Sequence, residues 1–140
     1  MKTYRIERAL DGKVICEVVW VRGRATTPVT YRLERVNLHG SMGFGTGESG
    51  AGPADLAASI LGDYVGALPE SLEREWQHRL SVKYLDPAGR LAIAFHRDFK
   101  EQFIAPRRLD PGERYEITST EIDEFLKAGI EEDLKRLEEE

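Results

Sequence analysis

Hydrophobic and polar residues alternate through the first forty residues in a pattern that predicts β-strands. Asp11-Gly12 lies between two apolar runs and is typical of a two-residue hairpin turn, because both central positions of that turn favour positive φ. Residues 29–34 then alternate between apolar and polar side chains. We therefore expect residues 1–40 to form a three-stranded antiparallel meander.

A glycine-rich loop follows, and after it the apolar spacing becomes helical. In residues 53–65 apolar side chains recur every three or four positions, which predicts an amphipathic helix. Gly52 would cap this helix and Pro53 would be its first residue. Asp55 would then lie in the first turn, where the helix dipole favours a carboxylate.

The C-terminal part combines helices with one short strand. Residues 96–104 are expected to be helical, and residues 115–117 alternate as a strand would. Thr118 and Glu121 have the spacing of a capping box, so a final helix should begin there.

Residues 80–95 fit two interpretations. Alternating apolar residues on either side of Asp86-Pro87-Ala88-Gly89 favour a second hairpin built on a type I turn. A helix that begins at Pro87 is the alternative, because apolar residues from Leu91 onward also recur every four positions.

These elements predict an α+β fold in which helices pack on one face of an antiparallel N-terminal sheet, with the short strand at 115–117 as its fourth member. The chain has 140 residues, a length that suits one domain. We expect that domain to span residues 1–128 and to be followed by an acidic helical tail, residues 129–140.

Charge is distributed unevenly along the chain, whose net charge is −5. Residues 1–40 carry eight Lys/Arg and four Asp/Glu, a net charge of +4. Residues 110–140 carry four Lys/Arg and twelve Asp/Glu, a net charge of −8. Such asymmetry permits a basic face for nucleic acid or contact between oppositely charged parts of two chains.

No apolar run approaches the roughly 20 residues of a membrane span, and residues 1–10 do not resemble a signal peptide. Cys16 is the only cysteine, so no internal disulfide can form. We therefore expect a cytoplasmic protein that does not engage a membrane.

The glycine loop raises the question of phosphate binding. Gly45, Gly47 and Gly50 match G-x-G-x-x-G, and Ser49 lies among them. These four residues are the candidate binding residues if the loop holds a nucleotide or phosphate. The expected strands before the loop are antiparallel, however, and no Lys-Ser/Thr pair follows its last glycine.

Two acidic residues also argue against phosphate at this loop. Glu48 lies within it, and Asp55 would occupy the positive end of the following helix. We therefore favour a structural loop in which the glycines permit positive φ and close backbone approach.

No arrangement of residues predicts a metal site or a catalytic centre. The three histidines, His39, His78 and His96, are far apart and form no close ligand pair. Ser49 lies in a sequence similar to G-x-S-x-G, but Ala51 replaces the last glycine. We expect a non-enzymatic protein with no cofactor and no metal.

Nucleic-acid binding is an alternative suggested by the basic N-terminal strands. Arginines interleaved with Trp20 and Tyr31 can hold phosphates and stack bases. The candidate residues are Arg22, Arg24, Arg32 and Arg35. Both aromatic residues are also well placed to fill a core.

Three stretches carry a resemblance to a known family: "GFGTGESGAGPADLAASIL", "FHRDFKEQFIA" and "YEITSTEIDEFL". Together they resemble a family of small uncharacterised proteins found mainly in phages, plasmids and bacterial genomes. Its members share a Gly/Tyr-rich loop, a Gly-Pro-x-x-Leu-Ala helix, a Phe-Lys-x-x-Phe-Ile-Ala helix and an Ile-Thr-x-x-Glu-Ile cap.

The resemblance covers residues 42–126. Residues 67–91 are longer here than in short members, and Phe44 stands where Trp and Tyr are common. The resemblance implies a mobile-element origin but supplies no catalytic residue. Our leading hypothesis is an accessory protein that binds a protein partner or itself, ahead of nucleic-acid binding and then phosphate binding at the loop.

Overall fold

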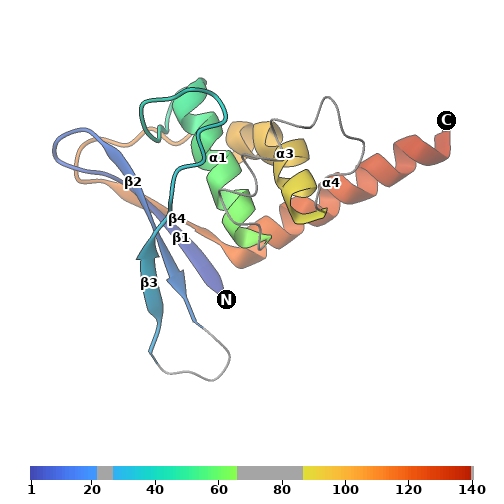
Figure 1. Cartoon of the computed structure of the whole chain (residues 1–140), viewed down its shortest axis with the longest axis horizontal. Coiled ribbons are helices and arrows are strands. Elements are labelled where there is room, and N and C mark those ends of the chain that lie inside the picture. Colours follow the sequence, from blue (N-terminus) through green and yellow to red (C-terminus); the bar gives the residue numbers. More distant parts are fainter. Residues whose placement is uncertain (22–26, 66–86, 140) are drawn as a thin grey trace.

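The computed structural model describes residues 1–21, 27–65 and 87–139, and its elements form an α+β fold (Figure 1). Four antiparallel strands make one sheet in the order β3-β2-β1-β4. The strands are β1 (Lys2–Arg8), β2 (Val14–Trp20), β3 (Val29–Arg32) and β4 (Arg114–Thr118). The predicted meander and the fourth strand near 115–117 are thus confirmed.

The helices pack on one face of this sheet (Figure 1). They are α1 (Ala51–Tyr64), α3 (Pro87–Phe99), the π-helical segment η1 (Lys100–Ile104) and α4 (Ser119–Glu139). The helix expected at 96–104 is therefore present as the end of α3 and η1. Within the described residues, no helix combines the length and the apolar character that crossing a bilayer requires.

The hairpin interpretation of residues 80–95 is wrong in its second half, because α3 begins at Pro87. Ala92, His96 and Phe99 are spaced by four and three positions and are all buried, so helical geometry puts them on one covered face. An alternating strand would have placed Ile93 and Phe95 on one face and Ala92 on the other. Residues 80–86 lie outside the described residues.

Helix α1 begins earlier than expected, at Ala51 with Gly50 as its N-cap. Asp55 is therefore the fifth residue of the helix, outside the first turn, and its side chain is fully buried. Small residues in α1 let neighbouring elements approach from several sides, and every residue from Pro53 to Gly62 is buried.

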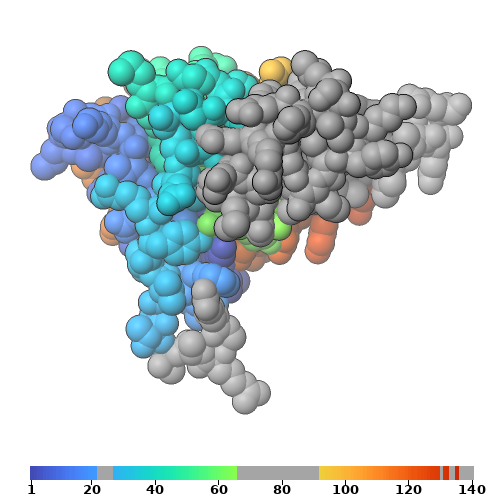
Figure 2. Space-filling view, in the orientation of Figure 1, coloured from blue at the N-terminus to red at the C-terminus, as the bar shows by residue number. Residues whose placement is uncertain are grey.

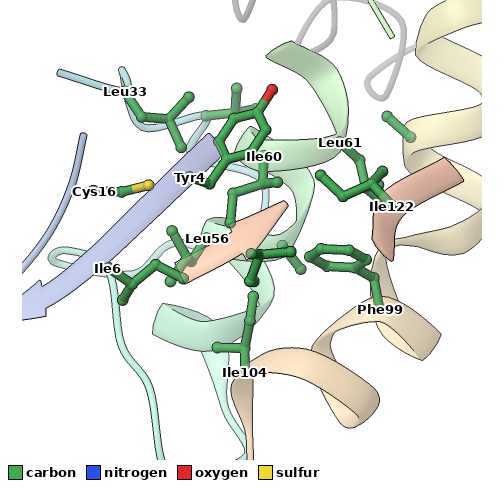
Figure 3. Packing of buried hydrophobic residues seen from close by; sticks show 14 of the residues in the cluster. Tyr4, Ile6, Cys16, Leu33, Leu56, Ile60, Leu61, Phe99, Ile104 and Ile122 are labelled. Atoms are coloured by element: carbon green, nitrogen blue, oxygen red, sulfur yellow. The ribbon is translucent and has the colours of Figure 1, made fainter. Parts of the chain in front are cut away.

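The core lies between the sheet and these helices (Figure 3). Tyr4, Ile6 and Cys16 point from the sheet towards α1. Fully buried residues that share this core are Leu56, Ile60, Leu61, Phe99, Ile104, Ile117 and Ile122. Their removal from water is the main source of stability, at roughly 25 cal/mol per Å² of apolar surface.

Polar contacts fix the ends of two helices. At the end of α1, Asp63 accepts hydrogen bonds from Tyr4 and Tyr31, each at 2.5 Å, and from Lys2 Nζ at 2.9 Å. At the start of α4, the expected capping box is present, since Glu121 N donates to Thr118 Oγ1 and Thr118 N donates to Glu121 Oε1. Helix α4 continues through residues 128–129, where we had expected the domain to give way to a tail.

Candidate functional site

The glycine loop is packed against its own protein. A β-carbon at Gly45 would lie 2.7 Å from Pro53 Cδ, and one at Gly52 would lie 3.0 Å from Gly45 N. Phe44 makes an isolated β-bridge to Val14, which ties the loop to the sheet. In Figure 2, the segment from β3 through the loop to the start of α1 runs continuously over this face, coloured light blue at β3 and cyan to teal in the loop.

The middle of the loop is joined to the turn after η1. Gly47 has φ +76°, and its N–H donates to Ile104 O at 3.0 Å. Thr46 is buried, and its hydroxyl lies within hydrogen-bonding distance of Ile104 O, Arg107 O and the Tyr115 hydroxyl. Gly45 and Gly47 are thus engaged by the fold, which supports the structural interpretation of this part of the loop.

The end of the loop has a different environment. Gly50 caps α1 without a side-chain hydrogen bond, and it borders a cavity of about 330 Å³. The cavity is lined by His39, Gly50, Ala51, Ala54, Arg97 and Lys100. Ser49 Oγ lies 3.4 Å from Lys100 Nζ and 3.4 Å from Glu101 Oε1. The four candidate loop residues therefore do not form one site.

Asp55 does not lie at the positive end of α1, where we expected its carboxylate to compete with a phosphate. Its carboxylate accepts hydrogen bonds from Leu38 N at 3.1 Å, from His39 N at 2.9 Å and from the Ser41 hydroxyl. It is not part of the cavity lining, and neither is Glu48. Asp55 instead fixes the loop between β3 and α1, and thereby places His39.

His39 and His96 meet although they are 57 positions apart, and their Nε2 atoms are 2.9 Å from each other. His96 is buried, and its Nδ1 lies 2.7 Å from Ile93 O. A carbonyl oxygen only accepts, so Nδ1 carries the hydrogen and a neutral His96 presents Nε2 as an acceptor to His39. Sequence spacing gave no signal for this pair.

Of the four candidate nucleic-acid residues, the structure describes Arg32 and Arg35, which have different surroundings. Arg32 is exposed on β3. Arg35 turns towards the loop, donating from Nη1 to Ser41 O at 2.5 Å and lying 3.8 Å from Asp55 Oδ2. Arg22 and Arg24 lie outside the described residues. Nucleic-acid binding stays a prediction that rests on sequence.

A groove with a volume of about 470 Å³ lies between α3 and α4. Phe103 and Phe125 are half-buried in it, and their ring centroids are 5.9 Å apart in an edge-to-face arrangement. Phe99 supports both rings from the core, at 4.8 and 5.3 Å. The lining residues are Phe95, Asp98, Gln102, Phe103, Glu121, Glu124, Phe125, Ala128, Gly129 and Glu132.

Local sequence explains why the two helices meet here. Phe95, Phe99 and Phe103 recur every four residues, so they line one side of α3 and η1. Gly129 lets α4 approach, because a β-carbon there would lie 2.8 Å from Phe95 Cε1. The sequence pattern showed each apolar stripe but not that the two stripes leave a groove between them.

The described residues on the rim of this groove carry one sign of charge. Asp98, Glu121, Glu124 and Glu132 line it, and no Lys, Arg or His is among the described residues of the lining. Asp98 lies on α3, whereas the three glutamates lie on α4. An apolar floor with a negative rim can hold an apolar group that has positive charges beside it.

Chemically reactive groups are scarce in the part of the chain that the structure describes. No group of three or more His, Cys, Asp and Glu side chains there could hold a metal ion. Burial raises the pKa of the Cys16 thiol far above its ordinary value, so the thiol stays protonated. Burial also raises the pKa of Tyr115 to about 12, although its contact with Thr46 acts in the opposite direction.

Comparison of this chain with protein-family models, with curated proteins and with solved structures finds no match in any of the three. The resemblance noted from the sequence therefore stays a prediction.

Proposed function

We propose that this chain is a non-enzymatic interaction domain that binds a segment of another protein in the α3–α4 groove. One observation carries the proposal: Phe103 and Phe125 line an open groove of about 470 Å³ and remain only half-buried. Aromatic side chains in a concave surface are typical of binding sites, because a partner's apolar group gains there by leaving water.

The surrounding residues support binding rather than chemistry. The described residues that line the groove include no Ser, Thr, Cys, Lys or His, and their side chains are aromatic, small, carboxylate or amide groups. Ser49, the serine that we weighed as a nucleophile, has Lys100 and Glu101 as hydrogen-bonding neighbours. Both contacts are long for hydrogen bonds, and none of these three residues lines the groove.

A peptide-display selection can test the proposal directly. We expect random 16-residue peptides to enrich on the full chain and to lose binding on Ala128→Arg. Ala128 is exposed and lines the groove, so an arginine there fills the groove without removing any core group. Binding should weaken at least about tenfold, as expected when a central contact is blocked.

Ala94→Arg is the matched control, because Ala94 is also exposed on a helix but does not line the groove. Peptides selected on the unmodified chain should bind this variant within about twofold. The proposal fails if no peptide enriches, or if the enriched peptides bind both variants equally.

Phosphate binding at the cavity beside α1 is a second candidate function. His39, Arg97 and Lys100 supply its titratable lining groups, and all three are basic side-chain types. Lys100 is partly neutralised by Glu101, 3.2 Å away, whereas Arg97 has no ion pair within the described residues. The adjoining start of α1 also favours an anion.

Inorganic phosphate, titrated at constant ionic strength and followed by amide NMR, tests this candidate. We expect the Gly50 and Ala51 signals to shift with phosphate but not with chloride. The shifts should disappear in Arg97→Gln and persist in Arg108→Gln, an exposed arginine outside the cavity. Equal shifts with both salts would exclude the candidate.

A further inference from the structure

We infer that the occupant of the α3–α4 groove is a basic amphipathic helix of a partner protein, an inference that rests on the proposed function. The groove runs along α3 and η1 from Phe95 to Phe103, and these eight residue steps span about 12 Å at roughly 1.5 Å per step. Two turns of a helix cover that length, so anchors at positions i, i+3 or i+4 and i+7 would reach along the floor.

A helix suits this groove better than an extended peptide does. Both walls are helical, and the floor is made of side chains. Helices use their own backbone groups in internal hydrogen bonds, so these walls offer no open strand edge. An extended peptide would leave its backbone donors and acceptors unpaired beside the aromatic rings, which is costly. A helical partner pairs those groups internally.

The charge of the rim defines the partner's chemistry. Asp98 stands on α3, and Glu121 and Glu124 stand on α4, so carboxylates flank the aromatic floor on both walls. Lys or Arg beside the partner's apolar anchors would meet them from either side. An acidic partner would instead add repulsion to the desolvation of its own carboxylates.

A second copy of this chain fits less well. The rim is negative and the chain as a whole has a net charge of −5, with −8 in residues 110–140. Two such grooves repel each other at short range, whereas a basic partner is attracted. The basic part of a second copy is residues 1–40 with a net charge of +4, and its described residues contain the strands β1 to β3 rather than a helix. Charge complementarity thus favours a different protein.

Three synthetic 16-residue peptides separate these requirements. The first places Leu and Phe at helical spacing among Lys and Arg, the second replaces every Lys and Arg by Glu, and the third keeps the first composition with two central prolines. Binding to the full chain is measured by fluorescence anisotropy at about 50 and 300 mM salt, where electrostatic screening differs strongly. We expect only the first peptide to bind, and to bind more weakly at high salt.

Two double variants with the same change in net charge locate the effect. Asp98→Asn with Glu124→Gln neutralises the rim, and we expect about tenfold weaker binding of the basic peptide. Asp110→Asn with Glu131→Gln removes two exposed carboxylates that do not line the groove, and should change binding less than twofold.

The outcomes distinguish this inference from the proposed function. Equal weakening in both double variants, or tight binding of the glutamate or proline peptide, overturns the basic helix. If display-selected peptides of another chemistry still bind and are blocked by Ala128→Arg, the groove remains an interaction site. A concentration-dependent dimer in sedimentation that Ala128→Arg dissociates would assign the groove to a second copy and overturn the inference.

Discussion

The glycine loop and the α3–α4 groove differ in what fills them. In the loop, Thr46 and Gly47 direct their polar groups onto Ile104 O, and Gly45 and Gly47 lie against proline or backbone atoms. In the groove, Phe103 and Phe125 contact each other but keep part of their surface open. Close packing by the protein's own atoms is typical of a structural region, and incomplete packing of large apolar groups is the reason that we propose the second region as a binding surface.

The largest loss of stability should come from replacing Asp55, which holds the segment between β3 and α1 in place. Asp55→Ala leaves Leu38 N, His39 N and the Ser41 hydroxyl without their acceptor inside the protein. We expect the free energy of unfolding to fall by about 3 kcal/mol, measured by urea denaturation. Ser41→Ala, which removes only one of these bonds, should cost less; equal costs would contradict the assignment of Asp55 as the organising group.

A pair of glycine substitutions tests whether the loop is filled. Gly47→Ala combines a φ of +76° with a β-carbon 2.7 Å from Arg108 Cα, so the backbone must move. We expect a loss of about 2 kcal/mol in the free energy of unfolding. Gly50→Ala is the control, because a β-carbon there meets nothing within 4 Å. Equal costs in the two variants would mean that the loop is not closely packed at Gly47.

Elements that depend on neighbouring residues could be predicted from the sequence. The capping box at Thr118 and Glu121 is local and appears as the residue types indicated. A hairpin also turns at Asp11-Gly12, but the expected two-residue turn is wrong, because only Gly12 has positive φ, at 88°, and Ala9 N donates to Lys13 O across a longer loop. Residues 91–95 were ambiguous because a short apolar run fits either period. The segment is a helix because helical spacing lets His96 and Phe99 be buried together against the rest of the fold.

Neither candidate site could be recognised along the chain. His39 and His96 meet only because Asp55 holds one loop against α1 while α3 packs beside it. Asp98 and Glu124 each resemble ordinary exposed helix residues, and their common rim exists only once α3 and α4 are adjacent. The glycines gave the strongest sequence signal for a ligand, yet Gly45 and Gly47 are engaged by the protein itself.

Stability at alkaline pH tests the burial of Tyr115, whose hydroxyl contacts Thr46 of the loop. Burial raises the pKa of Tyr115 to about 12 in the folded protein, above the value of about 10 for an unfolded chain. The neutral phenol therefore adds stability that is complete below about pH 10 and is lost as the pH rises towards 12. In Tyr115→Phe, the free energy of unfolding should fall less steeply over this range than in the unmodified chain, as measured by urea denaturation at each pH. Identical slopes would show that this phenol does not ionise with unfolding.

The smallest change in stability is expected at the groove rim, because we propose that the rim serves binding and not folding. Asp98→Asn with Glu124→Gln removes two exposed carboxylates, neither of which has an ion pair within the described residues. The free energy of unfolding should change by less than about 0.5 kcal/mol, as is usual for surface substitutions. The same variant should lose most of its affinity for the basic peptide. If the rim variant lost as much stability as Asp55→Ala, the rim carboxylates would be needed for folding, which would contradict the proposed binding role. A loss of peptide affinity without a loss of stability is the result that we expect of a partner-binding surface.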